Sequence, residues 1–446
     1  MNNRLDVLLI NVPTSKKYKK GLAEVSSMPP LGIMYIASCL KKYNYTVKII
    51  DMAVEFFDKS EFRRKLLEEN PRMIGISSFV ESWSAIKVIT KFIKSILPNV
   101  IISAGGPFAT FRYKQVLNET LIDYVTFAEG EYVVKNLADS IIRNIINVED
   151  VDGIAFRKNG KIFLTKPNER IKDLDSLEFP DRDLINLEKY VYPITISTAR
   201  GCPGKCMFCS SRAYWGKKIF FRTPENIIKE ILEVEQKYQD NMFFIVDDTF
   251  TINTERAMKF CDLLLKTNKK FIWGCESRAD VVSEELLNSL YKAGCRKIQF
   301  GMESANNEIL KKLGKKVTIE QIENATSIAA NIGFDINISF IIGHAFDTHE
   351  TVRETINFAL MLKKKYQANV LASINTPYPG TELYKNHESY GIELLTDDWD
   401  SYTMNEPVIN TKYLTAVQIK QYHQSFINAL TNKDKRFIVP NICMEE

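Results

Sequence analysis

Two long runs of alternating strand-like and helix-like segments constrain the fold of this chain more than any other feature. In residues 1–145, short β-branched segments alternate with segments whose apolar residues recur at helical spacing. Doubly buried strands separated by helices predict a doubly wound, Rossmann-like parallel sheet with helices on both sides. The expected strands are residues 7–11, 46–51, 73–77, 100–104 and 124–126, and the expected helices are residues 32–42, 60–69, 83–96 and 131–142.

The second run begins at residue 194 and predicts a different α/β architecture. Helical stretches again separate the strands, such as residues 224–237, where Thr223 suits the N-cap and Pro224 the first helical position. Six βα units predict a partial (β/α)6 barrel, in which catalytic groups lie on the loops that follow the strands. The expected strands are residues 194–198, 242–246, 271–275, 297–301, 335–342 and 369–375.

The remaining segments are a connector between the runs and a tail after them. In the connector, Asn159-Gly160 separates the strand-like residues 153–157 and 161–164, which is typical of a β-hairpin. In the tail we expect one amphipathic helix. Its apolar face would carry Ile419, Tyr422, Phe426 and Leu430. The expected domains are a sheet domain at 1–145, a linker with a hairpin at 146–192, a partial barrel at 193–384 and a helical C-terminal extension at 385–446.

Composition excludes several classes of function. The 446-residue chain is 45% hydrophobic and 26% charged, and no apolar run reaches the roughly 20 residues of a membrane-spanning helix. The N-terminus has no signal-peptide pattern, so we expect a cytoplasmic protein. The net charge of +4 is a small difference between 59 basic and 55 acidic residues, and the lysine-rich residues 16–20 are interpreted as a solvated loop. We therefore expect no nucleic-acid partner.

The cysteines are the strongest chemical signal. Eight in a chain of this length do not make a disulfide framework, and three of them, Cys202, Cys206 and Cys209, are crowded into eight residues after the first barrel strand. Three thiolates on one loop suit a 4Fe–4S cluster that leaves one iron without a protein ligand. Structural zinc is the alternative, but it needs a fourth ligand, and no Cys or His lies nearby in the sequence.

The C-x3-C-x2-C spacing resembles the signature of the radical S-adenosylmethionine superfamily. The resemblance implies that the open iron binds the amino and carboxylate groups of S-adenosylmethionine. Reduction, by an electron donor such as a flavodoxin or ferredoxin, then yields methionine and a 5′-deoxyadenosyl radical. Phe208 matches the aromatic residue that precedes the third cysteine and lies near the adenine in that family, although a core position is its alternative.

Later strand ends resemble the same family. Asp248, in the pair Asp247-Asp248, stands where relatives contact the methionine amine, with helix capping as the alternative. Arg278 could clamp the methionine carboxylate or form an ordinary surface ion pair. The Glu303-Ser304 pair matches a G-x-E-S motif whose polar groups approach the ribose and the methionine.

One turn departs from the family pattern. Relatives usually have Gly-Leu-Pro-Gly-Glu-Thr after the fifth barrel strand, whereas residues 343–348 read Gly-His-Ala-Phe-Asp-Thr. His344 is therefore a candidate contact to a substrate or cofactor. A structural histidine with satisfied hydrogen bonds is the alternative.

The N-terminal third resembles the cobalamin-binding domain that precedes the barrel in one large radical S-adenosylmethionine subclass. Glycines at its strand ends would let a corrin approach the backbone, although turns in any doubly wound sheet use glycine too. The first histidine of the chain is His344, so no histidine of this domain can ligate cobalt, and Phe108 replaces a histidine often present in the subclass. The candidate cobalamin contacts are Ser77, Ser103, Gly105, Gly106 and Pro107.

These resemblances imply a cobalamin-dependent radical methyltransferase that acts on an unactivated carbon of a metabolite, peptide or lipid. A cyclase or rearrangement enzyme that uses cobalamin without methyl transfer is one alternative. A non-catalytic iron–sulfur scaffold is another. The cofactors would be the 4Fe–4S cluster, S-adenosylmethionine and cobalamin.

Overall fold

The computed structural model describes residues 4–16, 26–55 and 57–431. The chain divides into two compact units, Met1–Thr195 and Ile196–Glu446, which we describe separately. Residues 17–20 of the lysine-rich run and Cys443 lie outside the described residues. No helix among the described residues is long and apolar enough to cross a membrane.

The first unit is built on a sheet whose central strands are parallel. Within the described residues the strand order is β2-β1-β3-β4-β5-β6-β7, and β1 to β5 pair in parallel. The predicted strands 7–11 and 73–77 match β1 and β3 residue for residue. The parallel strands are β1 Val7–Asn11, β2 Val47–Asp51, β3 Met73–Ser77, β4 Ile101–Gly105 and β5 Tyr124–Thr126.

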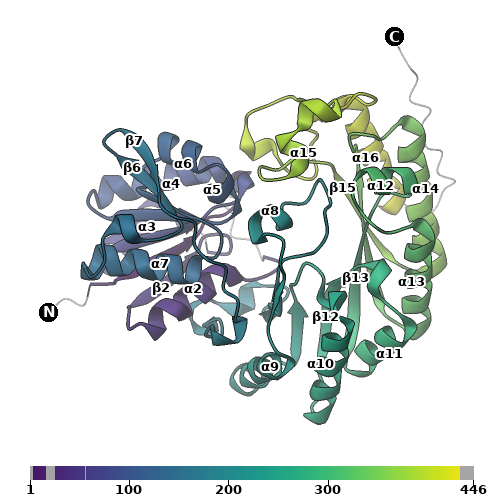
Figure 1. The fold of residues 1–446 in the computed structure, drawn as a ribbon, viewed down its shortest axis with the longest axis horizontal. Helices are drawn as coiled ribbons and strands as arrows, with labels where there is room; N and C mark the ends of the chain where they lie inside the picture. Colours follow the sequence, from purple (N-terminus) through teal and green to yellow (C-terminus); the bar gives the residue numbers. More distant parts are fainter. Residues whose placement is uncertain (1–3, 17–25, 56, 432–446) are drawn as a thin grey trace. The chain divides into compact units, whose positions relative to one another are not determined.

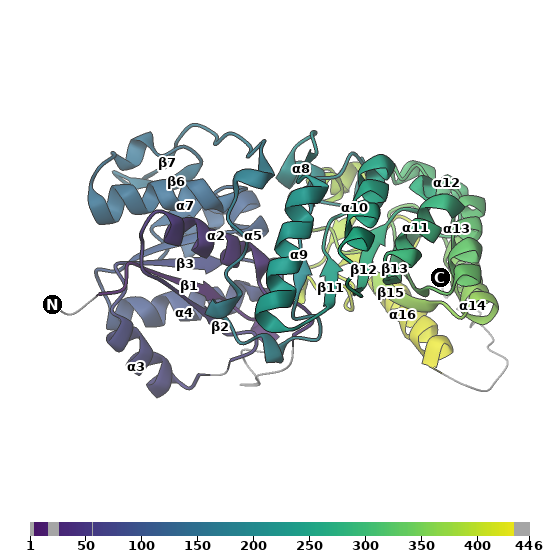
Figure 2. The ribbon, with the colours of Figure 1, turned by 90° about the horizontal axis from the view of Figure 1, so that it is seen from below.

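Helices cover both faces of this sheet, as Figure 2 shows, with α2 and α7 on one side and α3 and α4 on the other. The residues of α2 and α7 that face the sheet form an apolar core with β1 and β2, including the fully buried Val7, Ala37 and Leu137. The predicted doubly wound architecture is confirmed. The helices are α2 Leu31–Lys42, α3 Lys59–Glu69, α4 Trp83–Ile96, α5 Pro107–Phe111, α6 Tyr113–Glu119 and α7 Gly130–Ala138.

The hairpin expected in the connector is present and belongs to the first sheet. Its strands, β6 Ile154–Lys158 and β7 Lys161–Leu164, are antiparallel, and β6 pairs with β5. Asn159 and Gly160 have φ of 51° and 73°, as a tight hairpin turn requires. The segment expected to be a linker thus adds two strands to the edge of the first sheet.

The second unit contains a six-stranded sheet with the order β15-β14-β13-β12-β11-β8 in the described chain. The neighbours from β11 to β15 pair in parallel, as expected for a partial barrel. Two short antiparallel pairs, β9 with β10 and β16 with β17, lie outside it and were not predicted. The six strands are β8 Thr195–Ile196, β11 Met242–Ile245, β12 Ile272–Ser277, β13 Cys295–Glu303, β14 Asp335–Ile342 and β15 Asn369–Ile374, and the short pairs are β9 Ala199–Arg200, β10 Phe220–Phe221, β16 Glu393–Leu394 and β17 Ile409–Asn410.

Helices, among them α10, α11, α13 and α14, cover one face of this sheet (Figure 1). The ring of Trp273 on β12 meets Phe260 of α10 at 5.5 Å, and Phe340 on β14 meets Phe426 of α16 at 6.1 Å. Thr223 caps α9 through its hydroxyl, as its place before Pro224 predicted. The helices are α8 Ser211–Trp215, α9 Pro224–Tyr238, α10 Thr254–Lys266, α11 Glu284–Lys292, α12 Asn307–Lys312, α13 Ile319–Ile332, α14 His349–Tyr366, α15 Glu382–Lys385 and α16 Ala416–Thr431.

The first strand of this sheet is shorter than the predicted 194–198. The backbone N–H of Thr198 donates to a carboxylate oxygen of Asp247 at 2.6 Å instead of to a neighbouring strand. The chain then turns into β9, which pairs with β10. A side chain therefore ends the strand at the point where the cysteine loop begins.

Candidate functional site

The three crowded cysteines lie on one irregular loop between β9 and α8. Cys202 and Cys206 are half-buried and Cys209 is exposed. The N–H of Cys209 donates to the carbonyl of Cys206 at 3.1 Å, which curls the end of the loop. The sequence predicted that the loop comes directly after the first barrel strand, whereas the short strand β9 lies between β8 and the loop.

Met207, the buried residue of this loop, fastens it to two distant segments. Its N–H donates to the carbonyl of Leu313 at 3.0 Å, and its carbonyl accepts from the N–H of Leu383 at 2.9 Å. A Cβ on Gly314 would stand 2.6 Å from the carbonyl oxygen of Lys205, so only glycine allows this approach. The loop is therefore held mainly through the backbone of Met207, and the sulfur of Cys202 accepts only a long hydrogen bond of 3.5 Å from the N–H of Gly204.

Cationic side chains surround the thiols. The Nζ of Lys315 forms a buried ion pair with Glu303 at 2.6 Å, and Arg278 forms a two-pronged contact with Asp280. Burial raises the pKa of Cys206, while Lys315 and Arg278 oppose that rise. Each of these cations is paired with a carboxylate, so they limit the rise in the pKa of Cys206 without reversing it.

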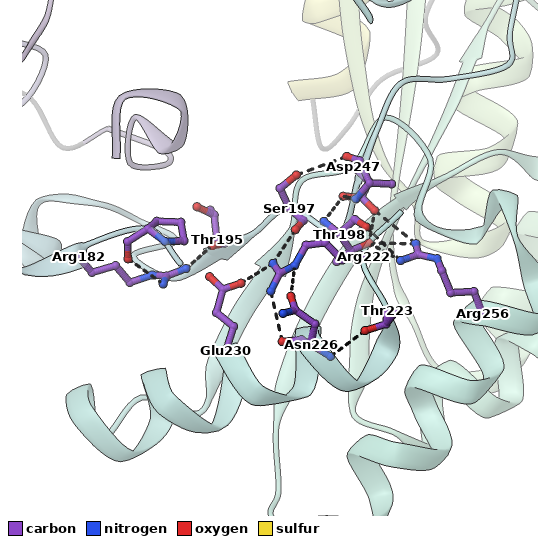
Figure 3. Close-up of polar contacts among 12 residues, drawn as sticks. Arg182, Thr195, Ser197, Thr198, Arg222, Thr223, Asn226, Glu230, Asp247 and Arg256 are labelled. Carbon is purple, nitrogen blue, oxygen red and sulfur yellow. Dashed lines mark hydrogen bonds and ion pairs between the residues drawn. The ribbon is translucent and has the colours of Figure 1, made fainter. Parts of the chain in front are cut away.

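The two adjacent aspartates after β11 have different environments. Asp247 is buried, accepts from the N–H groups of Thr198 and Ala199, and lies 3.6 Å from Arg256 (Figure 3). Burial raises its pKa, and Arg256 opposes that rise. Asp247 therefore has a structural role.

Asp248 is exposed, and its carboxylate accepts a hydrogen bond of 2.6 Å from Ser211 at the start of α8. It does not cap the next helix, because Asn253 caps α10. Although the residue as a whole is exposed, protein atoms around the Cys209 thiol raise its pKa to about 11, and the charge of Asp248 adds to this rise. Asp248 therefore stands beside the third cysteine of the loop, with a carboxylate that can accept further bonds.

Glu303 and Ser304 end β13 in a strained turn. Glu303 has φ of 72°, a left-handed conformation that a residue with a side chain rarely adopts. Its carboxylate pairs with Lys315 beside Cys206. Ser304 is buried, and its hydroxyl accepts from the N–H of Asn306 at 3.3 Å, so it helps to close the turn. Of this pair, Glu303 is the residue whose side chain reaches the cysteine loop.

Phe208 and His344 face each other with their ring centroids 5.8 Å apart. His344 is fully buried, and neither ring nitrogen makes a hydrogen bond of normal geometry to a described residue, although the nearby backbone of Glu303 acts on the imidazole. Its backbone is held by Asp347, which accepts from the N–H of His344 at 2.9 Å. Burial lowers the pKa of the imidazole to about 4, so the ring is neutral. A buried ring with open nitrogens beside the cysteine loop does not match the expected satisfied structural histidine.

The donors on this loop fit a 4Fe–4S cluster. No set of three His, Cys, Asp or Glu side chains in the described ranges is arranged to hold a single metal ion. Thiolates that ligate different irons of a cluster stand farther apart than thiolates that share one ion. Cys202, Cys206 and Cys209 could ligate three irons and leave the fourth open, while the unpartnered nitrogens of His344 could receive a ligand.

In the first unit, the candidate residues gather at the carboxyl ends of β3 and β4. A Cβ on Gly105 would stand 2.6 Å from the Thr126 hydroxyl, and one on Gly106, at φ of 97°, would stand 2.9 Å from the carbonyl of Ser78. Glycine is therefore required by packing within this unit, whether or not a corrin is bound. Pro107 begins α5, and Phe108 is buried against the ring of Trp83.

The serines of this edge differ in their bonding. Ser77, the last residue of β3, is half-buried, and Ser103 is buried with a long hydrogen bond of 3.4 Å to the carbonyl of Ile74. Ser78 is 1% exposed, and its hydroxyl has no partner among the described residues. An orphaned buried hydroxyl at a strand end fits a bound polar ligand, so the residues present fit a cobalamin.

Sequence reasoning missed Lys315, Ser78 and Glu276. Lys315 sits in the run Gly314-Lys315-Lys316, which reads like an exposed turn, yet its side chain is 7% exposed. Ser78 adjoins the predicted Ser77 and differs from it only in facing the interior. Glu276 is a half-buried acid on β12, and only the alternation along that strand could have indicated that it faces away from the helices.

Comparison with known families agrees with this geometry. The model of the radical SAM superfamily matches residues 196–359, which include the cysteine loop and strands β11 to β14. The model of the B12 binding domain matches residues 24–138, within the first unit.

Relatives align over most of the chain. A Pyrococcus horikoshii protein described as an uncharacterized methyltransferase is 32% identical over 94% of this chain and 90% of its own length. The anaerobic magnesium-protoporphyrin IX monomethyl ester cyclase of Rubrivivax gelatinosus is 28% identical over 88% and 72%. The cytidylyl-2-hydroxyethylphosphonate methyltransferase of Streptomyces wedmorensis is 26% identical over 76% and 72%.

Solved structures share the fold of both units. The cobalamin-dependent S-adenosylmethionine radical enzyme OxsB superposes with a TM-score of 0.77 at 19% identity, covering 96% of this chain and 67% of that one. The radical S-adenosylmethionine methyltransferase TsrM of Kitasatospora setae superposes with a TM-score of 0.74 at 16% identity, covering 97% and 89%. The two family matches and the Pyrococcus relative identify the chain as a member of the radical SAM superfamily with an N-terminal B12-binding domain.

Proposed function

We propose that this radical SAM enzyme methylates an unactivated carbon, and that Cys202, Cys206 and Cys209 ligate its 4Fe–4S cluster. The observation that carries the proposal is the cysteine loop itself. Its backbone is fastened through Met207 to two distant segments, its three cysteines form no disulfide, and cations stand beside it. Three thiols without a fourth ligand suit a cluster with an open iron.

The side chains around the loop have separate proposed roles in holding S-adenosylmethionine. The exposed carboxylate of Asp248 is available to the methionine amine, while the guanidinium of Arg278 and the ammonium of Lys315 suit its carboxylate. Glu303 keeps Lys315 in place through the buried ion pair. Ser304, which we expected to contact the ribose, shapes the turn that presents Glu303.

Phe208 and His344 suit the nucleobase. An aromatic face stacks on a base, and a neutral buried imidazole offers one donor and one acceptor. His344 has both nitrogens open, and Phe208 lies between Cys206 and Cys209 in the sequence. This arrangement supports a base held beside the open iron.

The cobalamin contacts proposed for the first unit lie where β3 and β4 end: Ser77, Ser103, Gly105, Gly106 and Pro107, to which the structure adds Ser78. The carboxyl ends of strands are where parallel sheets bind ligands. No histidine precedes His344, so cobalt would have no histidine ligand from this unit. Together the three cofactors supply radical generation and a transferable methyl group, and the chain binds and orients them.

Methyl transfer and ring formation are the two candidate reactions. The Pyrococcus relative, which aligns over nearly the whole chain, and the Streptomyces relative are both described as methyltransferases, which supports the first. The magnesium-protoporphyrin cyclases of Rubrivivax gelatinosus and Cereibacter sphaeroides, each 28% identical, support the second. The partners would be a small-molecule or peptide substrate and a one-electron donor such as a flavodoxin or ferredoxin.

Product mass distinguishes these reactions. Cells with and without the gene are grown anaerobically on methyl-13C methionine, and their extracts are compared by mass spectrometry. Methyl transfer predicts a compound that gains one labelled methyl group only when the gene is present. It also predicts about one 5′-deoxyadenosine and one S-adenosylhomocysteine per product in the purified reaction. A gene-dependent product without the label would replace the methyltransferase by the cyclase. If neither a product nor 5′-deoxyadenosine is found, the non-catalytic iron–sulfur scaffold is the remaining hypothesis.

A further inference from the structure

The six-stranded sheet has a helix-covered outer face and a second, inner face. On β12, Trp273 points outward, because its ring packs on Phe260 of α10. Neighbouring residues of a strand point to opposite faces, so Gly274 and Glu276 point inward. A Cβ on Gly274 would lie 2.8 Å from the ring of Phe244 and 3.0 Å from the Cβ of Lys297, which places these two on the inner face as well.

Three polar side chains form a row across this inner face. Glu276 of β12 is in register with Gln299 of β13, and Gln299 is in register with Asn337 of β14. All three are half-buried, whereas the residues on either side of Gln299 along its strand, Ile298 and Phe300, are fully buried among the helices. The row therefore lies side by side on the face that the helices leave uncovered.

The hydrogen-bonding capacity of this row is almost unused. The only bond within it runs from the Gln299 amide to the Glu276 carboxylate and is long, at 3.4 Å. The side chain of Asn337 makes none to another described residue, and Glu276 has no ion pair with any described Lys, Arg or His. Burial, with the nearby charges of Asp248 and Glu303, raises the pKa of Glu276 to about 7. A carboxylate in these surroundings lacks a cation.

The row also lies on the path to the cysteine loop. Gly301 follows Gln299 by two residues on the same face of β13, and a Cβ there would be 3.1 Å from the Nζ of Lys315. Lys315 in turn acts on Cys206. Because a strand rises about 3.3 Å per residue, the row stands about 7 Å below Gly301. A molecule bound along the inner face would thus have one end at Glu276 and the other beside the cysteine loop.

We propose that Glu276, flanked by Gln299 and Asn337, binds the substrate, and that the substrate presents a protonated nitrogen to this carboxylate. The inference rests on the proposed function and narrows its substrate class. A cation beside Glu276 would favour its ionised form, which only accepts, whereas the two amides donate and accept, so the row matches an amine or guanidine next to a polar backbone. A hydrocarbon in this place would leave all three side chains unsatisfied, and such sites discriminate strongly against it.

The test begins with the labelled compound from the isotope experiment, and we expect it to contain a basic nitrogen. Purified wild type, Glu276→Gln, Glu276→Asp and the control Asp335→Asn are then assayed with that compound. Asp335 is an exposed residue at the far end of β14, paired with Lys297. We expect Glu276→Gln to raise KM at least tenfold with kcat changed less than threefold, Glu276→Asp to recover part of the loss, and Asp335→Asn to match wild type. Iron content and circular dichroism verify that each variant is folded and loaded.

A second arm removes the charge from the substrate. Acetylation of the basic nitrogen should raise KM at least tenfold for wild type and much less for Glu276→Gln, because the partner charge is already absent. If Glu276→Gln fails to fold, the change in KM on acetylation is compared between wild type and Glu276→Asp, and a smaller change in Glu276→Asp supports the inference. Three outcomes would overturn the inference and leave the methyltransferase proposal intact. They are a labelled compound without a basic nitrogen, an unchanged KM in Glu276→Gln, or an acetylation effect on KM that is equal in wild type and variants. No labelled compound at all would remove the proposed function and this inference with it.

Discussion

The carboxylate of Glu303 and the ammonium of Lys315 form an ion pair of 2.6 Å whose side chains are only 10% and 7% exposed. Charges this deeply buried are stable only as a pair, and here the pair ends a strand whose last residue has a strained φ. Lys315 also bears on the pKa of Cys206, so the fold and the candidate cluster site depend on the same contact.

We predict that Lys315→Met lowers the free energy of unfolding of the apoprotein by about 3 kcal/mol, because it leaves the Glu303 carboxylate buried without a partner. Urea denaturation followed by circular dichroism measures this loss. The double variant Lys315→Met with Glu303→Met should be clearly more stable than the single one. Lys365→Met, which removes an exposed pair with Glu323, should change stability by less than about 0.5 kcal/mol. Equal losses in the single and double variants would contradict the coupling.

We predict that Cys202→Ala, Cys206→Ala and Cys209→Ala each abolish the release of 5′-deoxyadenosine from S-adenosylmethionine. Each removes one of three iron ligands, and no other cysteine lies on the loop. After anaerobic reconstitution, chromatography measures 5′-deoxyadenosine and absorbance measures the cluster. Cys443→Ala, outside the motif, serves as the control and should retain wild-type turnover. Normal 5′-deoxyadenosine release from any loop variant would refute the assignment of ligands.

We predict that acid destabilises the wild-type apoprotein more than His344→Leu. Burial lowers the pKa of His344 to about 4, so the folded state holds the imidazole neutral while the unfolded state takes up a proton near pH 6.5. This contribution is complete above that value and is lost as the pH falls from 6.5 toward 4. Between pH 7 and pH 5 the loss is about 1–2 kcal/mol. Buried Asp347 titrates with the opposite sign, but it is common to both proteins. Parallel urea midpoints across this range would refute the prediction.

The sheet strands could be predicted because burial on both faces leaves an uninterrupted apolar run. Residues 7–11 and 73–77 are of this kind, and their predicted bounds are those of β1 and β3. The predicted length of the first barrel strand was too great, because the N–H of Thr198 donates to the side chain of Asp247 and not to a neighbouring strand. A hydrogen bond between residues 49 positions apart leaves no local trace in the sequence.

The cysteine loop could also be located from sequence, since its spacing is local. The environments of Asp247 and Asp248 could not be predicted from the sequence. The two residues are identical and adjacent, and only the fold determines that Asp247 is buried and Asp248 is not. Lys315 was missed for a similar reason, because its burial depends on Glu303, which is 12 residues away and held in a left-handed turn.

We predict that Ser78→Ala weakens cobalamin binding without weakening the apoprotein. The Ser78 hydroxyl is buried and has no partner in the described chain, so its removal should leave the unfolding free energy unchanged or slightly higher. If cobalamin hydrogen-bonds to it, the loss should raise the dissociation constant by roughly tenfold, the size of one hydrogen bond. Fluorescence quenching by added cobalamin measures affinity, and urea denaturation measures stability.

The matched control is Ser82→Ala, because Ser82 is equally buried but donates to the carbonyl of Val12 at 3.2 Å. It should lose about 1 kcal/mol of stability and keep its affinity for cobalamin. Gly106→Leu is less informative, because a Cβ there would meet the Ser78 carbonyl at 2.9 Å and disturb the fold itself. Unchanged affinity in Ser78→Ala would show that cobalamin does not bind to this hydroxyl. If the wild-type protein binds no cobalamin, the methyltransferase proposal is refuted.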